Sequence, residues 1–490
     1  MGGSFLPGGG PGVGGGVGPS GGMPGNGGGG NPAGGNAPSG GGPNGTGGSG
    51  PSDGSITDVG QFTPATCATT PTVMAGTIPM VGIATFASDL PGADRALIQF
   101  GKTTDYTLEA PVDWSAADHK TLMLGMAANS DYHYRIVVLA GDAACVSADA
   151  TFKTGALPAG APGKKTPTKG QSSEAPSPGF RLVAGGQGSR WVVIANVEGE
   201  IVWAYSFPGD VISAHMSWDG KYMYARNLGE FNAGQGGSLW RVPMEGGSAT
   251  QLNLVGGSHH DFTPTPTGIA YIAKQATGEC DQIYTAGPDG AGAAPKIDLT
   301  TMFAPFKTGQ GALTMGEKCH VNAINYHASE KFFTVSDREK DTLIKVSEDG
   351  EYMAGIGQSP TMGSPANHAV AAEDGTTWRV QHGHHWYGPN HVLVFSNGVF
   401  NSQASKVLHY TISGATATLD WTYNATGNSS TLGNVVKVAD GHIFIYASEA
   451  GSMHELDENH VMIQSLSGLG KGYMRYRPTL YGPPPDLDIE

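Results

Sequence analysis

The chain has 490 residues, among them 78 glycines and 32 prolines, and its 27 basic and 42 acidic side chains give a net charge of −15. This negative charge repels phosphate backbones and anionic lipid, so it argues against nucleic acid and membrane surfaces as partners. No run of 18 apolar residues is present, and we therefore expect no transmembrane span.

A glycine-rich tract opens the chain. Residues 1–50 contain 26 glycines and no charged side chain. Such a composition buries too little apolar surface to fold and behaves as a flexible chain. We expect residues 1–60 to be a disordered tether that attaches the rest of the protein to a cell surface, although no signal peptide pattern is visible at its start.

Residues 64–155 have the pattern of a small β-sandwich. Apolar, β-branched runs such as 80–86 and 132–139 alternate with clusters of Pro, Gly, Asn and Asp. Short strands at this interval are typical of a sandwich. The stretch 122–138 resembles the end of a fibronectin type III module, in which Tyr132 would bond back to the preceding corner and have a structural role.

Residues 156–178 have the composition of a linker, rich in Pro, Gly, Lys and Ser. In residues 179–485, apolar stretches such as 191–195 and 442–447 are separated by Asp-Gly turns, and no stretch has a sustained helical period. A long series of four-strand units indicates a β-propeller, here of about six blades. The predicted fold class is therefore all-β.

The four cysteines predict two disulfides. None has the C-x-x-C spacing that is typical of a zinc site. Cys67 and Cys145 flank the predicted sandwich, whereas Cys280 and Cys319 both lie in the predicted propeller. Two disulfides within domains favour an oxidising compartment, so we expect a periplasmic, cell-surface or secreted protein.

Histidines recur at one point of successive predicted blades. His215, His260, His320 and His382 are separated by 45, 60 and 62 residues, and Asn434 follows after 52 more. Because the symmetry of a propeller brings equivalent positions together, we expect them to surround one mouth of the channel, where propellers bind ligands. Further candidate substrate-binding residues are His259, Asn322, Arg226, His384 and His385, and Arg338 is a further candidate catalytic residue. Histidines outside this register are interpreted as structural: His119, His133, His327, His391, His409, His442, His454 and His460.

Clustered neutral imidazoles bind transition metals, exchange protons near neutral pH or act as nucleophiles. The alternation His382-x-His384 on a strand would place both rings on one face, as a metal site requires. Arg226 and Arg338, expected at the far ends of inner strands, favour an anion instead, because a guanidinium repels a metal ion and pairs with sulfate, phosphate or carboxylate. We expect no metal and no cofactor.

Three stretches of the predicted propeller carry a more specific pattern: His259-His260-Asp261, Cys319 to Tyr326 followed by Ser336-Asp337-Arg338, and Gln381-His382 followed by Phe395-Ser396-Asn397. Together they resemble the arylsulfate sulfotransferases, six-bladed propeller enzymes of the bacterial periplasm that transfer a sulfuryl group between phenols without a nucleotide donor. The segment 472–481 is similar to the closing segment of that family. The resemblance covers most of residues 180–485.

The resemblance implies a ping-pong reaction with an aryl sulfate as donor and a phenol as acceptor. His382 would be the nucleophile that becomes a sulfohistidine. The groups that hold the sulfuryl oxygens would be His260, His320 and Arg338, and Asn322 would orient them. Fixed cationic donors of this kind stabilise the charge that gathers on the oxygens in the transition state.

The sequence departs from the family after Gln381-His382, where Gly383-His384-His385-Trp386 replaces an acidic residue and a plain turn. An altered acceptor pocket, or His384 as a rival nucleophile, therefore stays open. Two other functions also stay open: a non-catalytic extracellular propeller that binds an anion or a carbohydrate, and a metal-dependent hydrolase or lyase.

Overall fold

The structure is a computed structural model. It describes residues 56–69, 71–228, 237–273, 280–306, 319–357, 359–360, 365–371, 378–398, 404–425 and 427–489. The predicted tether over residues 1–60 lies outside the described residues except for 56–60. Helical structure within the described ranges is limited to η1 (Val59–Gln61), η2 (Ala117–His119) and α1 (Thr300–Phe303). None of these helices is long and apolar enough to cross a membrane. The predicted all-β fold class is confirmed.

The first part of the described chain consists of two sheets. One contains β1 (Thr63–Pro64), β4 (Arg95–Gly101), β5 (Leu108–Pro111), β7 (Asp131–Ala140), β8 (Ala143–Val146) and β9 (Ala150–Lys153), and the other contains β2 (Thr72–Ala75), β3 (Gly82–Thr85) and β6 (Thr121–Met123). Alternate apolar residues of both sheets, such as Ile98, Met123 and Ile136, form one buried core. The predicted sandwich is therefore present.

The sandwich contains a hydrogen bond of Tyr132 and a disulfide that the sequence predicted. Tyr132 Oη accepts a hydrogen bond from the backbone N–H of Ala127 at 2.8 Å, which is the predicted contact with the preceding corner. Cys67 and Cys145 form the predicted disulfide, and so do Cys280 and Cys319 in the second part of the chain. The relation to fibronectin type III modules stays a prediction. Both disulfides fit an extracellular or periplasmic protein.

The second part of the described chain contains six antiparallel groups of four strands. In the order from the inner to the outer strand they are β35 (Met474–Arg477), β11 (Phe180–Ala184), β12 (Trp191–Ala195) and β13 (Ile201–Ser206); β14 (Val211–Met216), β15 (Tyr222–Asn227), β16 (Leu239–Pro243) and β17 (Thr250–Gln251); β18 (Ser258–Thr265), β19 (Gly268–Ala273), β20 (Gln282–Ala286) and β21 (Ala294–Asp298); β22 (Val321–His327), β23 (Phe332–Asp337), β24 (Thr342–Ser347) and β25 (Tyr352–Gly357); β27 (Gln381–Tyr387), β28 (His391–Ser396), β29 (Lys406–Ser413) and β30 (Thr416–Asn424); and β31 (Asn434–Lys437), β32 (Ile443–Ala447), β33 (Ser452–Leu456) and β34 (Met462–Ser467). We interpret each group as one blade.

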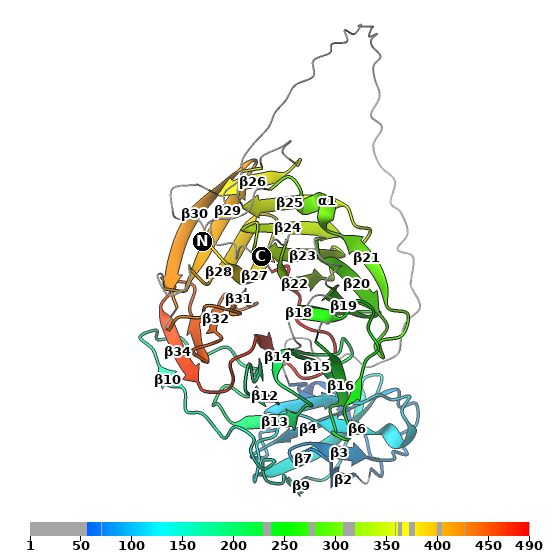
Figure 1. The fold of residues 1–490 in the computed structure, drawn as a ribbon. Coiled ribbons are helices and arrows are strands. Elements are labelled where there is room, and N and C mark those ends of the chain that lie inside the picture. The colour runs from blue at the N-terminus through cyan, green and yellow to red at the C-terminus, as the bar shows by residue number, and fades with distance from the viewer. Residues whose placement is uncertain are drawn as a thin grey trace, which may run out of the picture. The chain divides into compact units, whose positions relative to one another are not determined.

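The groups lie around a common centre, with β14, β18, β22, β27 and β31 nearest to it (Figure 1). Most strands are buried on both faces and are therefore almost continuously apolar, as in Phe180–Ala184 and Ile443–Ala447. The additional strand β26 (His368–Ala371) lies between β25 and β30 and joins two blades at their outer edges.

The two ends of the propeller close the ring. The last strand, β35, pairs antiparallel with the first, β11, so that Leu182 lies opposite Arg475. The side chain of Asn434 then joins the sixth blade to the first, because its Nδ2 donates to Met474 O at 2.8 Å and its Oδ1 accepts from Met474 N at 3.2 Å. Asn434, a predicted substrate-binding residue, therefore has its amide occupied by the seam of the ring.

The predicted linker, residues 156–178, is bound along the propeller. Its strand β10 (Thr168–Lys169) pairs with β34, and Ser172 Oγ donates to Asp457 at 2.5 Å. At its end, Ser177 N donates to Glu455, which also pairs with the buried guanidinium of Arg181. The composition of the linker predicted a boundary between domains but not these contacts, which depend on blade residues almost 300 positions away.

Candidate functional site

The inner strands of four blades begin with a β-bulge, and three of these bulges lie in the predicted motifs. The register shifts between Ser258 and Phe262 in β18, between Val321 and Ala323 in β22, and between Gln381 and His384 in β27. A bulge leaves residues outside the ladder and turns their side chains in a new direction. The residues released here are the polar ones of the predicted motifs: His259, His260, Asp261, Asn322, His382 and Gly383.

The backbone at two of these bulges has a conformation that is rare for non-glycine residues. His260 has φ = 57°, and Val380, which directly precedes Gln381-His382, has φ = 54°. A β-branched residue such as valine is an outlier in the left-handed region. Gly383 lies so close to Asn434 of the next blade that a Cβ at this position would collide with it, which explains the glycine after His382.

Four imidazoles form what we call the histidine cluster: His259, His260, His320 and His382. The Nδ1 atoms of His259 and His260 are 2.8 Å apart, and the Nε2 atoms of His260 and His320 are 3.2 Å apart. The ring centroid of His382 lies 6.1 Å from that of His260. Burial and the neighbouring imidazoles lower the pKa of His260 well below its usual value, so this ring is neutral at pH 7.

His382 is held in one tautomer by Asn397 at the end of the neighbouring strand. Asn397 Nδ2 donates to the carbonyl oxygens of Ser429 and Leu432 at 2.6 and 2.7 Å, which turns Oδ1 toward His382. His382 Nδ1 lies 2.7 Å from this oxygen and therefore carries the proton. Burial, with the charge of Arg338 as the next cause, lowers the pKa of His382 to about 3. The ring is neutral, and Nε2 carries its lone pair.

The two predicted arginines lie at the ends of second strands and not, as we expected, of inner ones. Arg226 is in β15, and Arg338 directly follows β23. Because a second strand runs antiparallel to its inner strand, its end lies beside the start of the inner strand, and Arg338 N donates to His320 O at 3.0 Å. Both guanidiniums are buried. Among the described residues, Arg226 Nη1 and Arg338 Nε have no hydrogen-bond partner.

Asn322 holds the strand that carries His382. Its Nδ2 donates to Gln381 O at 2.6 Å, and its own carbonyl accepts from Tyr473 Oη at 2.9 Å. Its Oδ1 is buried without a hydrogen-bond partner in the described part of the chain. Asn322 thus orients the backbone next to His382, from the adjacent blade.

The expected pairing of His382 with His384 on one strand face is wrong. Strict alternation fails because the bulge in β27 lies between Gln381 and His384. His382 faces Asn397, whereas His384 faces β22, the inner strand of the preceding blade, with Nε2 3.5 Å from Asn325 Nδ2. This divergence removes the geometric basis of the proposed two-histidine metal site. The ligand atoms of Cys280, Cys319 and Asp337 are close together, but the disulfide occupies both sulfurs.

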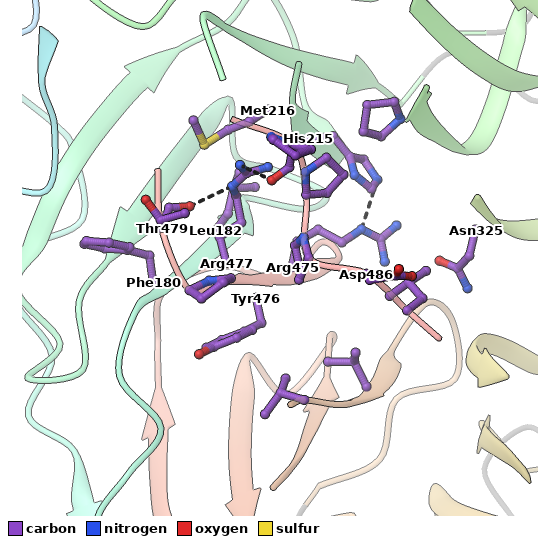
Figure 2. Close-up of a pocket in the computed structure, with 18 of the residues that line it drawn as sticks. Phe180, Leu182, His215, Met216, Asn325, Arg475, Tyr476, Arg477, Thr479 and Asp486 are labelled. Carbon is purple, nitrogen blue, oxygen red and sulfur yellow. Dashed lines mark hydrogen bonds between the residues drawn. The ribbon is translucent and has the colours of Figure 1, made fainter. Parts of the chain in front are cut away.

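His215 is also not part of the histidine cluster. It is the fifth residue of β14, beyond the bulge, and its Nε2 accepts a hydrogen bond from Arg475 Nε at 3.0 Å. Arg475 Nη2 binds both oxygens of Asp261 at 2.7 Å. Figure 2 shows His215 and Arg475 side by side, joined by this bond. Burial and the charge of Arg475 lower the pKa of His215 to about 4.

These residues line a cavity of about 900 Å³ on the side where the inner strands end, which we call the tail cavity. His384 and His385 contribute to it, as does the C-terminal tail, residues 478–489. Figure 2 shows Phe180, Leu182, Thr479 and Asp486 among the residues that line it. Arg477 Nη2 donates to the tail at Gly482 O and Pro483 O. His385 Nε2 donates to Leu487 O at 2.9 Å, while its Nδ1 accepts from Lys437 N. The cavity is therefore closed in part by the end of the chain.

Asn397 and Arg475 belong to these sites, but the sequence patterns predicted no role for either of them. Asn397 lies in a quoted motif, but its bond to His382 depends on the β27–β28 hairpin. Arg475 lies in the closing segment and reaches His215 across 260 positions. Knowing that the last strand returns to the first blade would have placed Arg475 on an inner strand.

One protein family matches the chain over most of the predicted propeller. The model of the family described as Arylsulfotransferase (ASST) matches residues 165–469. No curated protein matches the chain significantly. Solved structures that are similar to the chain include TolB from Acinetobacter baumannii, with 10% identity, a TM-score of 0.38, and coverage of 72% of this chain and 81% of that one. A streptogramin B lyase has 13% identity, a TM-score of 0.36, and coverage of 61% and 87%.

At such low TM-scores these structural likenesses carry no argument about function. The family match is of a different kind, because it spans more than half of the chain and includes every residue of the histidine cluster. The protein belongs to the arylsulfotransferase family, and this membership supports arylsulfotransferase activity in general.

Proposed function

We propose that the protein transfers a sulfuryl group from an aryl sulfate to a phenol in two steps, through a sulfohistidine at His382. The observation that carries this proposal is the state of His382. Its Nδ1 proton is committed to Asn397, and burial keeps the ring neutral, so Nε2 is a nucleophile at neutral pH. The family membership supplies the reaction class.

In the first step the bond from His382 Nε2 to sulfur forms while the bond from sulfur to the aryl oxygen breaks, and the phenolate leaves. In the second step the oxygen of the acceptor phenol attacks the same sulfur, the N–S bond breaks, and the phenolic proton passes to a nearby imidazole. His260, His320 and Arg338 bind the non-bridging oxygens in both steps. His260 and Arg338 are buried and His320 is partly buried, so their electrostatic stabilisation needs little rearrangement.

The buried arginines support the same site. Arg226 and Arg338 each keep one nitrogen without a hydrogen-bond partner among the described residues, and a buried donor of this kind costs free energy unless a ligand satisfies it. A sulfate ester offers acceptor oxygens and a negative charge. The same observation favours the second candidate, a propeller that binds an anion without catalysis. A covalent intermediate distinguishes the two functions.

The test is incubation with 4-nitrophenyl sulfate and a phenol. We expect release of nitrophenolate and, without acceptor, the added mass of one sulfuryl group on the peptide that contains His382. His382→Asn should show neither while keeping the β circular-dichroism spectrum and thermal transition of the wild type. His391→Asn, in β28 and outside the cluster, is the matched control and should retain both.

His384→Asn examines the rival nucleophile and should leave the adduct on His382. A sulfuryl group on His384, or full turnover by His382→Asn, would contradict the proposed mechanism. Binding of the aryl sulfate by the wild type with neither turnover nor adduct would favour the non-catalytic anion-binding propeller.

A further inference from the structure

We propose that Arg226 is a further catalytic residue, whose guanidinium binds the aryl oxygen of the donor in the first step and the phenolic oxygen of the acceptor in the second. This inference rests on the proposed function. It supplies a partner for the bridging oxygen, whereas His260, His320 and Arg338 bind the non-bridging ones. The phenol would leave, and attack, as a phenolate beside a fixed cation.

Arg226 and His382 lie on opposite sides of the ring of strand groups. His382 belongs to β27 in the fifth group and Arg226 to β15 in the second, and in a ring of six the second group faces the fifth. Figure 1 shows the inner strands of these two groups, β14 and β27, across the common centre from each other. In group transfer the attacking and leaving atoms lie roughly in line, as in phosphoryl transfer. An aryl oxygen in line with His382 Nε2 would therefore point to the side of Arg226.

The β14–β15 hairpin and the next inner strand fix the guanidinium beside the histidine cluster. Arg226 lies opposite Ser213 in the hairpin, and its Nε and Nη2 donate to Ser258 O at 3.3 and 2.8 Å. Ser258 is the first residue of β18, immediately before His259 and His260. Burial and the neighbouring imidazoles, with a contribution from Arg226, lower the pKa of His260. The guanidinium is thus close enough to act on the cluster.

The charge of Arg226 has no partner of opposite charge in the described part of the chain. The side chain is buried, and no described carboxylate forms an ion pair with it, whereas buried Arg181 and Arg338 pair with Glu455 and Glu339. Its Nη1 also has no hydrogen-bond partner among the described residues. Burial lowers the pKa of Arg226 to about 9, so the group is still charged at pH 7. A buried cation without a counter-ion is costly, and an anionic oxygen at Nη1 would supply both the charge and the acceptor.

Both steps of the reaction place negative charge on the oxygen at this position. In the first step the bond from His382 Nε2 to sulfur forms, the bond from sulfur to the aryl oxygen breaks, and that oxygen keeps the electron pair. In the second step the phenolic oxygen gives its proton to a nearby imidazole as it attacks sulfur, and the N–S bond breaks. A guanidinium fixed beside this oxygen stabilises the phenolate charge in both transition states and keeps its own protons.

The dependence of the rate on the leaving group tests this role. A nitro group already stabilises the phenolate, so the cation should matter most for the unsubstituted phenyl sulfate. In Arg226→Gln we expect adduct formation at His382 to slow on the order of 10-fold with 4-nitrophenyl sulfate and on the order of 10²- to 10³-fold with phenyl sulfate, as for the loss of one donor to a developing oxyanion. Rapid quenching and mass spectrometry would measure both rates. Arg226→Lys keeps the charge and should recover part of the rate with phenyl sulfate.

Two other arginines provide the controls. Arg338→Gln should slow adduct formation by the same factor with both donors, because the non-bridging oxygens are the same in each. Arg241→Gln is the matched control, since Arg241 also donates to a backbone carbonyl, that of Pro288, and it should leave both rates unchanged. The ratio of the two rates within one variant does not depend on the fraction of folded protein. A wild-type ratio in Arg226→Gln would show a merely structural role and overturn the inference.

A spectroscopic titration of bound 4-nitrophenol tests the same contact without turnover. The nitrophenolate absorbs visible light, so the pKa of the bound ligand can be measured directly. We expect this pKa to lie about one unit or more higher in Arg226→Gln than in the wild type, because an adjacent cation favours the anion. Arg241→Gln should give the wild-type value. An unchanged pKa in Arg226→Gln, or no binding of 4-nitrophenol by the wild type, would contradict the proposed contact.

The two proposals can fail separately. A wild-type protein that forms no adduct from either aryl sulfate would refute the proposed function, and the catalytic role of Arg226 with it. The titration would then still decide whether Arg226 binds a phenolate. An adduct on His382, together with an unchanged ratio between the two donors in Arg226→Gln, would refute the role of Arg226 and leave the proposed function intact.

Discussion

The histidine cluster and the tail cavity lie on the same inner strands, yet they use the same residue types for different purposes. Beside the histidine cluster, Arg226 and Arg338 keep nitrogens without a partner among the described residues. At the tail cavity, Arg475 binds both oxygens of Asp261, and Arg477 binds backbone carbonyls of the tail. Arginines with unsatisfied nitrogens can hold an anionic ligand, whereas those whose hydrogen bonds are taken up by the protein hold the fold together.

His382 and His384 show the same difference over two positions of β27. The bulge between them turns His382 toward Asn397 and His384 toward Asn325. Burial lowers both pKa values to about 3, so the two rings are equally neutral. Their pKa values therefore cannot distinguish a nucleophile from a structural histidine here, but their surroundings can.

The largest effect that we expect is on stability, at the tail cavity. Arg475→Ala would leave the buried carboxylate of Asp261 without its bidentate partner. Removal of one member of a buried pair typically costs about 3 to 5 kcal/mol, and the partial exposure of Arg475 favours the lower end of this range. Urea unfolding would measure the loss.

The double variant Asp261→Asn/Arg475→Ala removes the unpaired charge and should recover part of the lost stability. An unchanged unfolding free energy in Arg475→Ala would mean that the pair is not what holds this side of the ring together.

The next effect concerns activity, at the histidine cluster. Arg338→Gln keeps a donor for Glu339 but removes the cation, so the transition state loses stabilisation of its oxygens. We expect sulfuryl transfer to slow on the order of 10²-fold, together with a loss of unfolding free energy because the buried carboxylate of Glu339 loses its cationic partner. Arg241→Gln on β16 is the matched control and should be neutral. A loss of stability without a change in turnover would mean that Arg338 holds the fold together and does not bind the substrate.

The sequence predicted which blades carry the site, but not at which position along its strand each site residue lies. The eighteen residues from His320 to Arg338 span one hairpin, so their proximity was predictable. His215 has the spacing of one blade, but it is the fifth residue of its strand, whereas His382 is the second of its own. The bulges that determine these positions depend on packing between blades and have no sequence signal of their own.

A smaller effect that we expect at the tail cavity is a dependence of the unfolding free energy on pH. Burial lowers the pKa of His385 to about 3, below the value of about 6.5 for an unfolded histidine. Its stabilising contribution is complete above pH 6.5 and decreases as the pH falls, because the unfolded chain takes up a proton that the folded one refuses. The loss is at most about 1.4 kcal/mol per pH unit for this group.

His385→Gln retains a donor for Leu487 O and an acceptor for Lys437 N but cannot titrate. Between pH 6.5 and 5, its unfolding free energy should fall less steeply than that of the wild type. His215, His382 and His384 titrate in the same direction and remain in the variant, so only the difference between the two slopes is informative. Equal slopes would contradict the lowered pKa of His385 in the folded protein.

The smallest effect concerns the link between the tail and the sandwich. Tyr481 Oη accepts from Leu124 N at 2.8 Å and donates to Leu122 O at 3.0 Å. Tyr481→Phe removes both bonds, but the site is only partly buried, so water can satisfy the two backbone groups in part. We therefore expect a loss of about 1 kcal/mol in the unfolding free energy. The rate of sulfuryl transfer should not change, because the histidine cluster keeps all its contacts. A slower transfer in this variant would mean that the tail cavity is coupled to the cluster, and that the two regions form one functional site.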